Sequence, residues 1–173
     1  MQKKGENKLD ISPKAYFKKV EEIPIEYLVK NDIKVVILDV DNTLIDYTQQ
    51  LSPNIIKWVE NVKLQNIRLY ILSNTNKRKK VEKVAGILDV PYKYFGMKPL
   101  KIGFEKIRKK LNIEPQNIAV VGDQVFTDIL GGNRCNMHTI LIEPINEKDY
   151  WYTAWKRPIE NKIKQKMIDK EER

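Results

Sequence analysis

Polar residues that could carry out phosphate chemistry follow four of the predicted strands of this chain. They stand where an apolar run ends and the chain turns, as in KVVILDVDNTLID over residues 34–46. In an open parallel sheet such positions meet at one edge, outside the carboxyl ends of the strands, where ligands bind. The candidates are Asp39, Asp41, Asn42 and Thr43, then Ser73 and Asn74, then Lys98, and finally Gly122, Asp123, Thr127 and Asp128.

This combination of side chains is typical of a phosphoryl-transfer site. Several carboxylates at one edge are costly to bury unless a cation offsets their charge, and Mg²⁺ prefers oxygen ligands. A metal and a lysine would balance the charge of a phosphate while a carboxylate attacks phosphorus. The single His138 and the single Cys135 argue against a zinc site, and we expect both to be structural.

Each candidate also has a plainer interpretation. Asp39 and Asp41 could belong to a turn or a helix cap, and Ser73 could cap the helix that follows it. Lys98 stands in a lysine-rich chain, where a solvated charge is the ordinary role. The case for a site therefore depends on the four segments together.

Strands and helices alternate along the chain, which predicts an α/β fold with a doubly wound, mostly parallel five-stranded sheet and helices on both faces. The strands are expected at 33–40, 68–74, 91–96, 117–124 and 138–144, and the helices at 52–66, 76–88, 99–113 and 127–136. Residues 33–147 would form the core. Residues 1–32 would be a lead-in of helix or turn packed on its edge, and residues 148–173 an aromatic, basic and helical tail.

Composition favours a cytoplasmic protein with anionic partners. The chain of 173 residues is long enough for one domain, and its one cysteine excludes an intrachain disulfide. It contains no apolar run that could span a bilayer, and residues 1–10 lack the apolar core expected of a signal peptide. The net charge of +9 favours phosphate esters, nucleic acid or an acidic membrane surface, without choosing among them.

Four short motifs resemble those of the haloacid dehalogenase superfamily of phosphatases. They are DVDNT at 39–43, SN at 73–74, KP at 98–99 and GDQVFTD at 122–128. More closely, DNTL together with GDQxxTDIxGGNR resembles the YqeG family of subclass IIIA, which is related to the mitochondrial phosphatidylglycerophosphate phosphatases. The resemblance spans about residues 33 to 143.

The resemblance implies a two-step mechanism. Asp39 would attack phosphorus to form an aspartyl phosphate. Asp41 would protonate the leaving alkoxide and then take a proton from the hydrolysing water. Mg²⁺ would be held by Asp39, by the backbone carbonyl of Asp41 and by Asp123.

The same resemblance assigns supporting roles to other motif residues. Ser73, Asn74 and Lys98 would bind the phosphoryl group. Thr43 would orient Asp41, and Asp128 would position Lys98 or a metal-bound water.

The spacing of the motifs leaves no room for a cap domain. One helix with its connections occupies 43–73, and one helix with a short strand occupies 73–98. The site should be open, which favours a phosphate on a large or membrane-borne substrate. The family resemblance implies that this substrate is phosphatidylglycerophosphate or a similar lipid phosphate. A soluble phosphomonoesterase for metabolites or nucleic-acid ends is the alternative.

A phosphoacceptor receiver module is the third hypothesis. It would carry its acceptor aspartate after the third strand, where this chain has Gly96, Met97 and Lys98, so the sequence argues against it. The oligomeric state is not fixed by any of these patterns.

The tail and two basic clusters, NKRKKVEK at 76–83 and EKIRKK at 105–110, could dock the protein peripherally on the inner face of an anionic membrane. Trp151, Tyr152 and Trp155 lie beside Lys156 and Arg157, and indole rings prefer the headgroup region. The alternative is that these aromatic residues cover the edge of the sheet.

Overall fold

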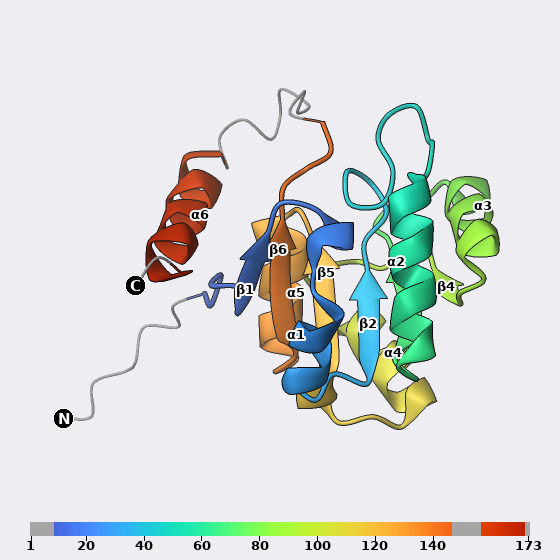
Figure 1. Cartoon of the computed structure of the whole chain (residues 1–173), viewed down its shortest axis with the longest axis horizontal. Helices are drawn as coiled ribbons and strands as arrows, with labels where there is room; N and C mark the ends of the chain where they lie inside the picture. Colours follow the sequence, from blue (N-terminus) through green and yellow to red (C-terminus); the bar gives the residue numbers. More distant parts are fainter. Residues whose placement is uncertain (1–8, 147–156, 172–173) are drawn as a thin grey trace.

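The protein is built on one parallel sheet, seen in a computed structural model that describes residues 9–146 and 157–171. Six strands lie in the order β1-β6-β5-β2-β3-β4, and every neighbouring pair is parallel (Figure 1). The strands are β1 Ala15–Phe17, β2 Val35–Leu38, β3 Arg68–Leu72, β4 Tyr92–Lys93, β5 Ile118–Gly122 and β6 His138–Ile142. The predicted α/β fold is confirmed.

Helices connect the strands and cover both faces of the sheet. The α-helices are α1 Ile25–Lys30, α2 Pro53–Leu64, α3 Arg78–Leu88, α4 Lys101–Leu111, α5 Leu130–Arg134 and α6 Arg157–Glu171. Two 3-10 turns, Val20–Glu22 and Pro115–Asn117, and one π-helical segment, Val125–Ile129, complete the path.

The alternation of side chains along β2 divides the core into two layers. Val36 and Leu38 pack among residues of α1, α2 and α3, whereas Val35 and Ile37 pack among residues of α4. Both faces of the strand are therefore covered, which explains its continuous apolar run. In Figure 1 α1 and α2 lie in front of the sheet and α4 lies behind it.

Local signals in the sequence account for the start of α2. The Ser52 hydroxyl accepts a hydrogen bond from the Asn54 backbone N–H at 3.3 Å, and Pro53 takes the first helical position. Both features are typical of helix N-termini. The connection between β2 and α2 passes the carboxyl ends of the strands, where the candidate residues lie.

The sheet has six strands rather than the predicted five. The additional strand, β1, lies in the lead-in that was expected to be helix or turn, and it pairs with β6 at the edge of the sheet. Three residues are too few to show a strand period, and lysines at 14, 18 and 19 flank them. This strand is therefore formed by the available edge of β6 and could not be recognised from its own sequence.

The helix α6 packs against β1 and β6 on that edge. Ile163 and Met167 of α6 pack near Tyr16 of β1 and Leu141 of β6. The tail residues Trp151, Tyr152, Trp155 and Lys156 lie outside the described residues, and the division of the chain at 32 and 147 stays a prediction. None of the helices in the described ranges is long and apolar enough to cross a bilayer.

The segments between the motifs hold no second domain. Residues 43–98 are all described, and they contain α2, β3, α3 and β4 with their connections. The expected absence of a cap in this part of the chain is thus confirmed, and the carboxyl edge of the sheet is left open there.

The packing of α1 predicts that the lead-in is needed for stability. Leu28 is fully buried in the core layer of α2 and α3, whereas the adjacent Val29 is 55% exposed. We expect Leu28→Ala to lower the free energy of unfolding by about 2–5 kcal/mol, because it leaves a cavity. Val29→Ala, the matched control, should change it by less than about 0.5 kcal/mol. Urea unfolding measures both, and equal effects would contradict the packing of this segment.

Candidate active site

The four predicted segments converge at the carboxyl edge of the sheet. β2 lies between β5 and β3, and β4 lies next to β3, so the residues that follow these strands are neighbours in space. Hydrogen bonds and short distances join Asp39, Thr43, Asn74, Lys98, Asp123 and Asp128, and Asp41 and Ser73 follow β2 and β3 at the same edge.

Lys98 is the centre of the charge arrangement at this edge. Its ammonium Nζ donates hydrogen bonds to Asp39 Oδ1 and to Asp128 Oδ1, each at 2.6 Å. The exposed fractions of the three side chains are 3%, 8% and 2%, so the two ion pairs are almost free of solvent. The charges of the two carboxylates outweigh the effect of burial and raise the pKa of Lys98, which therefore stays protonated.

Asn74 fixes the backbone of Lys98. Its side-chain Oδ1 accepts from the Lys98 N–H at 2.7 Å, and its Nδ2 donates to the Lys98 carbonyl at 2.8 Å. The Lys98–Pro99 peptide bond that follows is cis. Both ends of the Asn74 amide are engaged in this way, so the contacts described here position Lys98, and the phosphate contact expected of Asn74 stays a prediction.

Asp128 reaches Lys98 because a glycine stands beside it. A Cβ at Gly122 would lie 2.3 Å from Asp128 Cγ, too close for any other residue type. Asp128 belongs to the π-helical segment, and its Oδ2 accepts from the Gln124 N–H at 3.3 Å. Asp128 therefore contacts Lys98 directly, and its role in positioning Lys98 or a metal-bound water stays a prediction.

Thr43 contacts a different carboxylate from the one expected. Its buried hydroxyl donates to Asp123 Oδ1 at 3.2 Å, whereas the sequence predicted that it would orient Asp41. Thr43 lies in a tight turn over residues 40–45, in which the Leu44 and Ile45 N–H groups donate to the Val40 carbonyl, and its orienting role toward Asp41 stays a prediction. Thr43 therefore joins the first motif to the fourth.

The carboxylates could hold a divalent cation. One oxygen each of Asp39, Asp123 and Asp128 lies within 4.8 Å of the others. In the part of the chain that is described, Lys98 is the one cationic side chain ion-paired with any of the three. Three carboxylates facing one ammonium leave an excess of negative charge, which fits an oxygen-preferring cation.

The pKa values of two of these groups reflect the same imbalance. Burial raises the pKa of Asp39 to about 6, against the lowering effect of Lys98 and with a further rise from Asp128. Desolvation, together with the charges of Asp39 and Asp128, raises the pKa of Asp123 well above its ordinary value. Such shifts are common at functional sites.

Asp41 is not one of the three clustered carboxylates, and it forms an ion pair with a lysine that the sequence did not single out. Lys80, in the first turns of α3, forms an ion pair with Asp41 Oδ1. Their side chains are 18% and 40% exposed, so this pair lies at the open side of the site. Lys80 has no motif of its own and stands in the run KRKK, which gave no signal to separate it from solvated lysines.

Ser73 lies at the end of β3 and is almost fully buried. Its hydroxyl accepts from the Thr75 N–H at 3.2 Å, which stabilises the turn between β3 and α3. The hydroxyl proton remains able to donate to a ligand, as its predicted phosphate contact requires.

Comparison with known proteins agrees with this geometry. The family described as mitochondrial PGP phosphatase matches residues 2–146. The chain belongs to this family. Over 152 residues it is 34% identical to the Bacillus subtilis (strain 168) protein named "Probable phosphatase YqeG", a similarity that covers 87% of this chain and 88% of that protein. The protein is thus a haloacid dehalogenase superfamily phosphatase of the YqeG type.

Solved structures share the fold. An uncharacterized protein from Listeria monocytogenes serotype 4b matches with a TM-score of 0.56 and 21% identity, over 68% of this chain and 84% of that one. A HAD phosphatase from Thermococcus onnurineus matches with a TM-score of 0.50 and 24% identity, over 60% of this chain and 50% of that one. The family favours a phosphatase over the receiver module.

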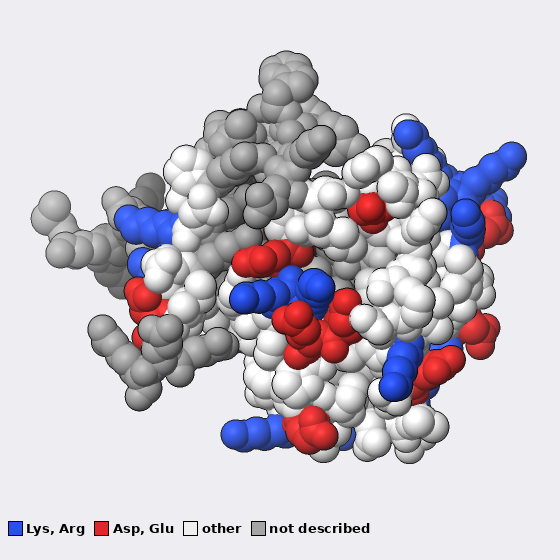
Figure 2. Space-filling model, turned by 45° about the horizontal axis from the view of Figure 1, so that its top comes forward, with Lys and Arg blue, Asp and Glu red and all other residues white. Residues whose placement is uncertain are grey.

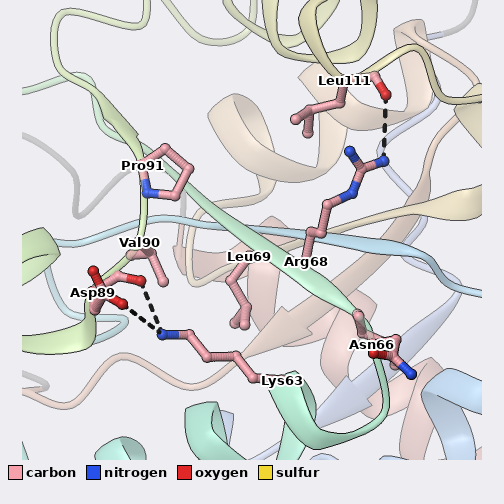
Figure 3. A pocket seen from close by; sticks show the side chains of 9 residues that line it. Lys63, Asn66, Arg68, Leu69, Asp89, Val90, Pro91 and Leu111 are labelled. Carbon is pink, nitrogen blue, oxygen red and sulfur yellow. Dashed lines mark hydrogen bonds and ion pairs between the residues drawn. The ribbon is translucent and has the colours of Figure 1, made fainter.

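A hollow of about 400 Å³ lies at the opposite edge of the sheet (Figure 3). There Lys63 Nζ donates to the Leu88 and Asp89 carbonyls at 2.8 and 2.9 Å, and Arg68 donates to the Leu111 carbonyl at 3.3 Å. These carbonyls lie at the C-terminal ends of α3 and α4, where cations are favourable. The hollow therefore reflects helix termination and is separate from the phosphatase site.

The raised pKa of Asp123 predicts a pH-dependent cost in the metal-free protein. Its ordinary pKa is 3.8, so the contribution of this group to stability is present below that pH and is lost as pH rises through the higher folded-state pKa. Asp123→Asn keeps an acceptor for Thr43 without the charge. In EDTA it should raise the melting temperature by a few degrees at pH 8, where 1 kcal/mol corresponds to about 2–4 °C.

The control conditions are part of this prediction. At pH 4 the variant and the wild type should melt together, and the exposed Asp10→Asn should change neither curve. An Asp123→Asn variant that melts below the wild type at pH 8 in EDTA would contradict the proposed cost of ionising the buried Asp123.

Proposed function

We propose that this phosphatase is Mg²⁺-dependent and hydrolyses a lipid phosphate monoester, phosphatidylglycerophosphate or a close analogue, through an aspartyl-phosphate intermediate. The observation that carries the chemistry is the buried cluster in which Asp39 faces Lys98 next to Asp123 and Asp128. A strand-end carboxylate with cationic partners is the arrangement that a phosphoryl acceptor requires.

In the first step an Asp39 carboxylate oxygen attacks phosphorus. The bond between Asp39 oxygen and phosphorus forms while the bond from phosphorus to the alcohol oxygen breaks. Asp41 gives its proton to the departing alkoxide, and Lys98 with Ser73 stabilises the phosphoryl oxygens.

In the second step Asp41, now a carboxylate, takes a proton from a water molecule. That water attacks phosphorus, which breaks the aspartyl-phosphate bond and releases inorganic phosphate. A positioned acid and base of this kind contributes about 10²- to 10⁴-fold.

The residues that would hold Mg²⁺ are Asp39, Asp123 and the backbone carbonyl of Asp41. The ion would supply charge compensation for the transferred phosphoryl group. The excess of carboxylates over Lys98 in the buried cluster is the structural support for this assignment.

The lipid substrate is supported by the family description and by exposed apolar residues on both sides of Lys98 in the sequence, here called the apolar rim. The rim comprises Tyr94, Phe95, Met97, Leu100 and Ile102, which are 37%, 56%, 37%, 50% and 46% exposed. Exposed apolar patches of this kind mark interaction or membrane sites. No inserted domain covers residues 43–98, so a substrate carried on a bilayer could itself exclude water from the site.

Basic residues provide a second reason to expect an anionic surface as partner. Lys77, Arg78 and Lys79 are exposed at the start of α3, and Figure 2 shows Lys and Arg side chains gathered at this end of the molecule. Each such charge near an anionic bilayer is worth about 1 kcal/mol. We place the protein in the cytoplasm, docking peripherally at the inner face of the membrane.

The mechanism predicts a dependence on both Asp39 and Mg²⁺. Asp39→Asn should lower the turnover of an aryl phosphate by about 10³-fold or more, because the nucleophile is lost. EDTA should abolish wild-type turnover, and Mg²⁺ should restore it. Steady-state kinetics measures both effects. Asp89→Asn, which changes an exposed carboxylate away from the site, is the control and should keep wild-type activity. Retained turnover in Asp39→Asn would refute the covalent mechanism.

The apolar rim predicts binding to anionic vesicles. Phe95 has a positive φ of 50°, which suits asparagine, so Phe95→Asn removes the aromatic ring without backbone strain. Its binding to phosphatidylglycerol vesicles should weaken about tenfold in co-sedimentation, as expected for losing one buried aromatic side chain. Leu64→Asn, which is 76% exposed at the end of α2, is the matched control and should bind as the wild type does.

The same experiment separates lipid from soluble substrates. Wild-type binding should be lost at high salt and absent on neutral vesicles. If the protein ignores anionic vesicles at low salt and hydrolyses sugar or nucleotide phosphates better than phosphatidylglycerophosphate, the soluble phosphomonoesterase is correct instead.

A further inference from the structure

Lys80 reaches the site from α3, outside the four motifs. Its ammonium is paired with Asp41 Oδ1 at the open side, whereas Lys98 is held inside by Asp39 and Asp128. Lys98 is therefore enclosed in the buried cluster, whereas Lys80 is partly exposed and has a different carboxylate partner. Among the described residues, these are the lysines ion-paired with carboxylates of the motifs.

The two ammonium groups are paired with the two aspartates that act on different parts of a phosphate ester, the phosphoryl group and the leaving alcohol. Asp39, the attacking group in the proposed function, faces Lys98, so Lys98 lies with the phosphoryl group. Asp41, the proton donor to the departing alkoxide, faces Lys80. Lys80 therefore lies with the alcohol that leaves.

Lys80 retains hydrogen-bonding capacity toward that alcohol. An ammonium has three donors, and Asp41 Oδ1 is the one acceptor that the described part of the chain provides to it. Its side chain is 18% exposed, so a ligand can reach it, and it is screened less than a fully solvated lysine.

We infer that Lys80 forms a second anion subsite, which selects phosphate monoesters whose leaving alcohol carries another anionic group, such as a phosphodiester. This inference rests on the proposed function and narrows its substrate class. The glycerol phosphodiester of a phospholipid meets the requirement, since it is negatively charged and lies a few bonds from the reacting phosphate. A phosphate monoester of an uncharged alcohol offers Lys80 no second anion, so Asp41 remains its one anionic partner.

A plainer role for Lys80 would be to position Asp41. In that case a neutral residue at this place would slow the hydrolysis of every phosphate monoester by the same factor. The anion subsite predicts a selective loss, in which only substrates with the second charge are affected strongly. Selectivity between two substrates therefore separates the two roles.

The test compares two water-soluble substrates, so that vesicle docking does not enter. The first is glycerophosphoglycerol phosphate, the deacylated headgroup with its phosphodiester, and the second is glycerol 3-phosphate. Wild-type kcat/KM should favour the first. Lys80→Gln should reduce that preference about tenfold, mainly through KM, as expected for one lost charge contact. Lys80→Arg should keep most of the preference.

Two controls keep the result interpretable. Lys83→Gln changes an exposed lysine one turn further along α3 and should leave the preference as in the wild type. If Lys80→Gln lacks a cooperative melt, Lys80→Met takes its place. In the wild type itself, the preference should decrease as NaCl is raised, because a partly exposed charge contact is screened.

The outcomes that overturn the inference differ from failure of the proposed function. An equal loss on both substrates assigns Lys80 to positioning, and a wild type without preference removes the subsite. Either result leaves the Asp39 mechanism in place. Turnover that survives Asp39→Asn refutes the mechanism itself, whatever the selectivity.

Discussion

The site depends on burying an unequal number of charges at one edge of the sheet. Lys98 donates hydrogen bonds to Asp39 and Asp128. Asp123 accepts a hydrogen bond from the Thr43 hydroxyl, and no ammonium group of the described residues is ion-paired with it. Without a further cation this arrangement is costly, as the raised pKa values of Asp39 and Asp123 reflect. The fold thus holds an excess of negative charge that a bound cation could offset.

The surrounding structure is organised to hold that charge in place. Parallel strands deliver the carboxylates to one edge, and Asn74 clamps the backbone of Lys98 from both sides. Gly122 allows Asp128 to approach within a distance that no side chain would permit. These contacts fix the groups before a ligand arrives, which is the condition for electrostatic stabilisation of a transition state.

The site is open on one side, so a bound substrate would itself have to exclude water there. No inserted domain closes residues 43–98, and exposed apolar residues flank Lys98 instead. A lipid surface placed against this rim would exclude water and supply the missing wall. Lys80, partly exposed beside Asp41, is the group that we propose to contact the alcohol part of such a substrate.

The sequence by itself determined the alternation of strands and helices, the start of α2 at Ser52, and the motif residues that meet at one edge. These features are local, because apolar period, capping and strand-end position are properties of neighbouring residues. Only the tertiary structure decided that β1 is a strand, that Thr43 donates a hydrogen bond to Asp123, and that Lys80 forms an ion pair with Asp41. Each of these depends on a partner distant in sequence. A short strand or one lysine among many carries no local signal of the contact that the fold creates.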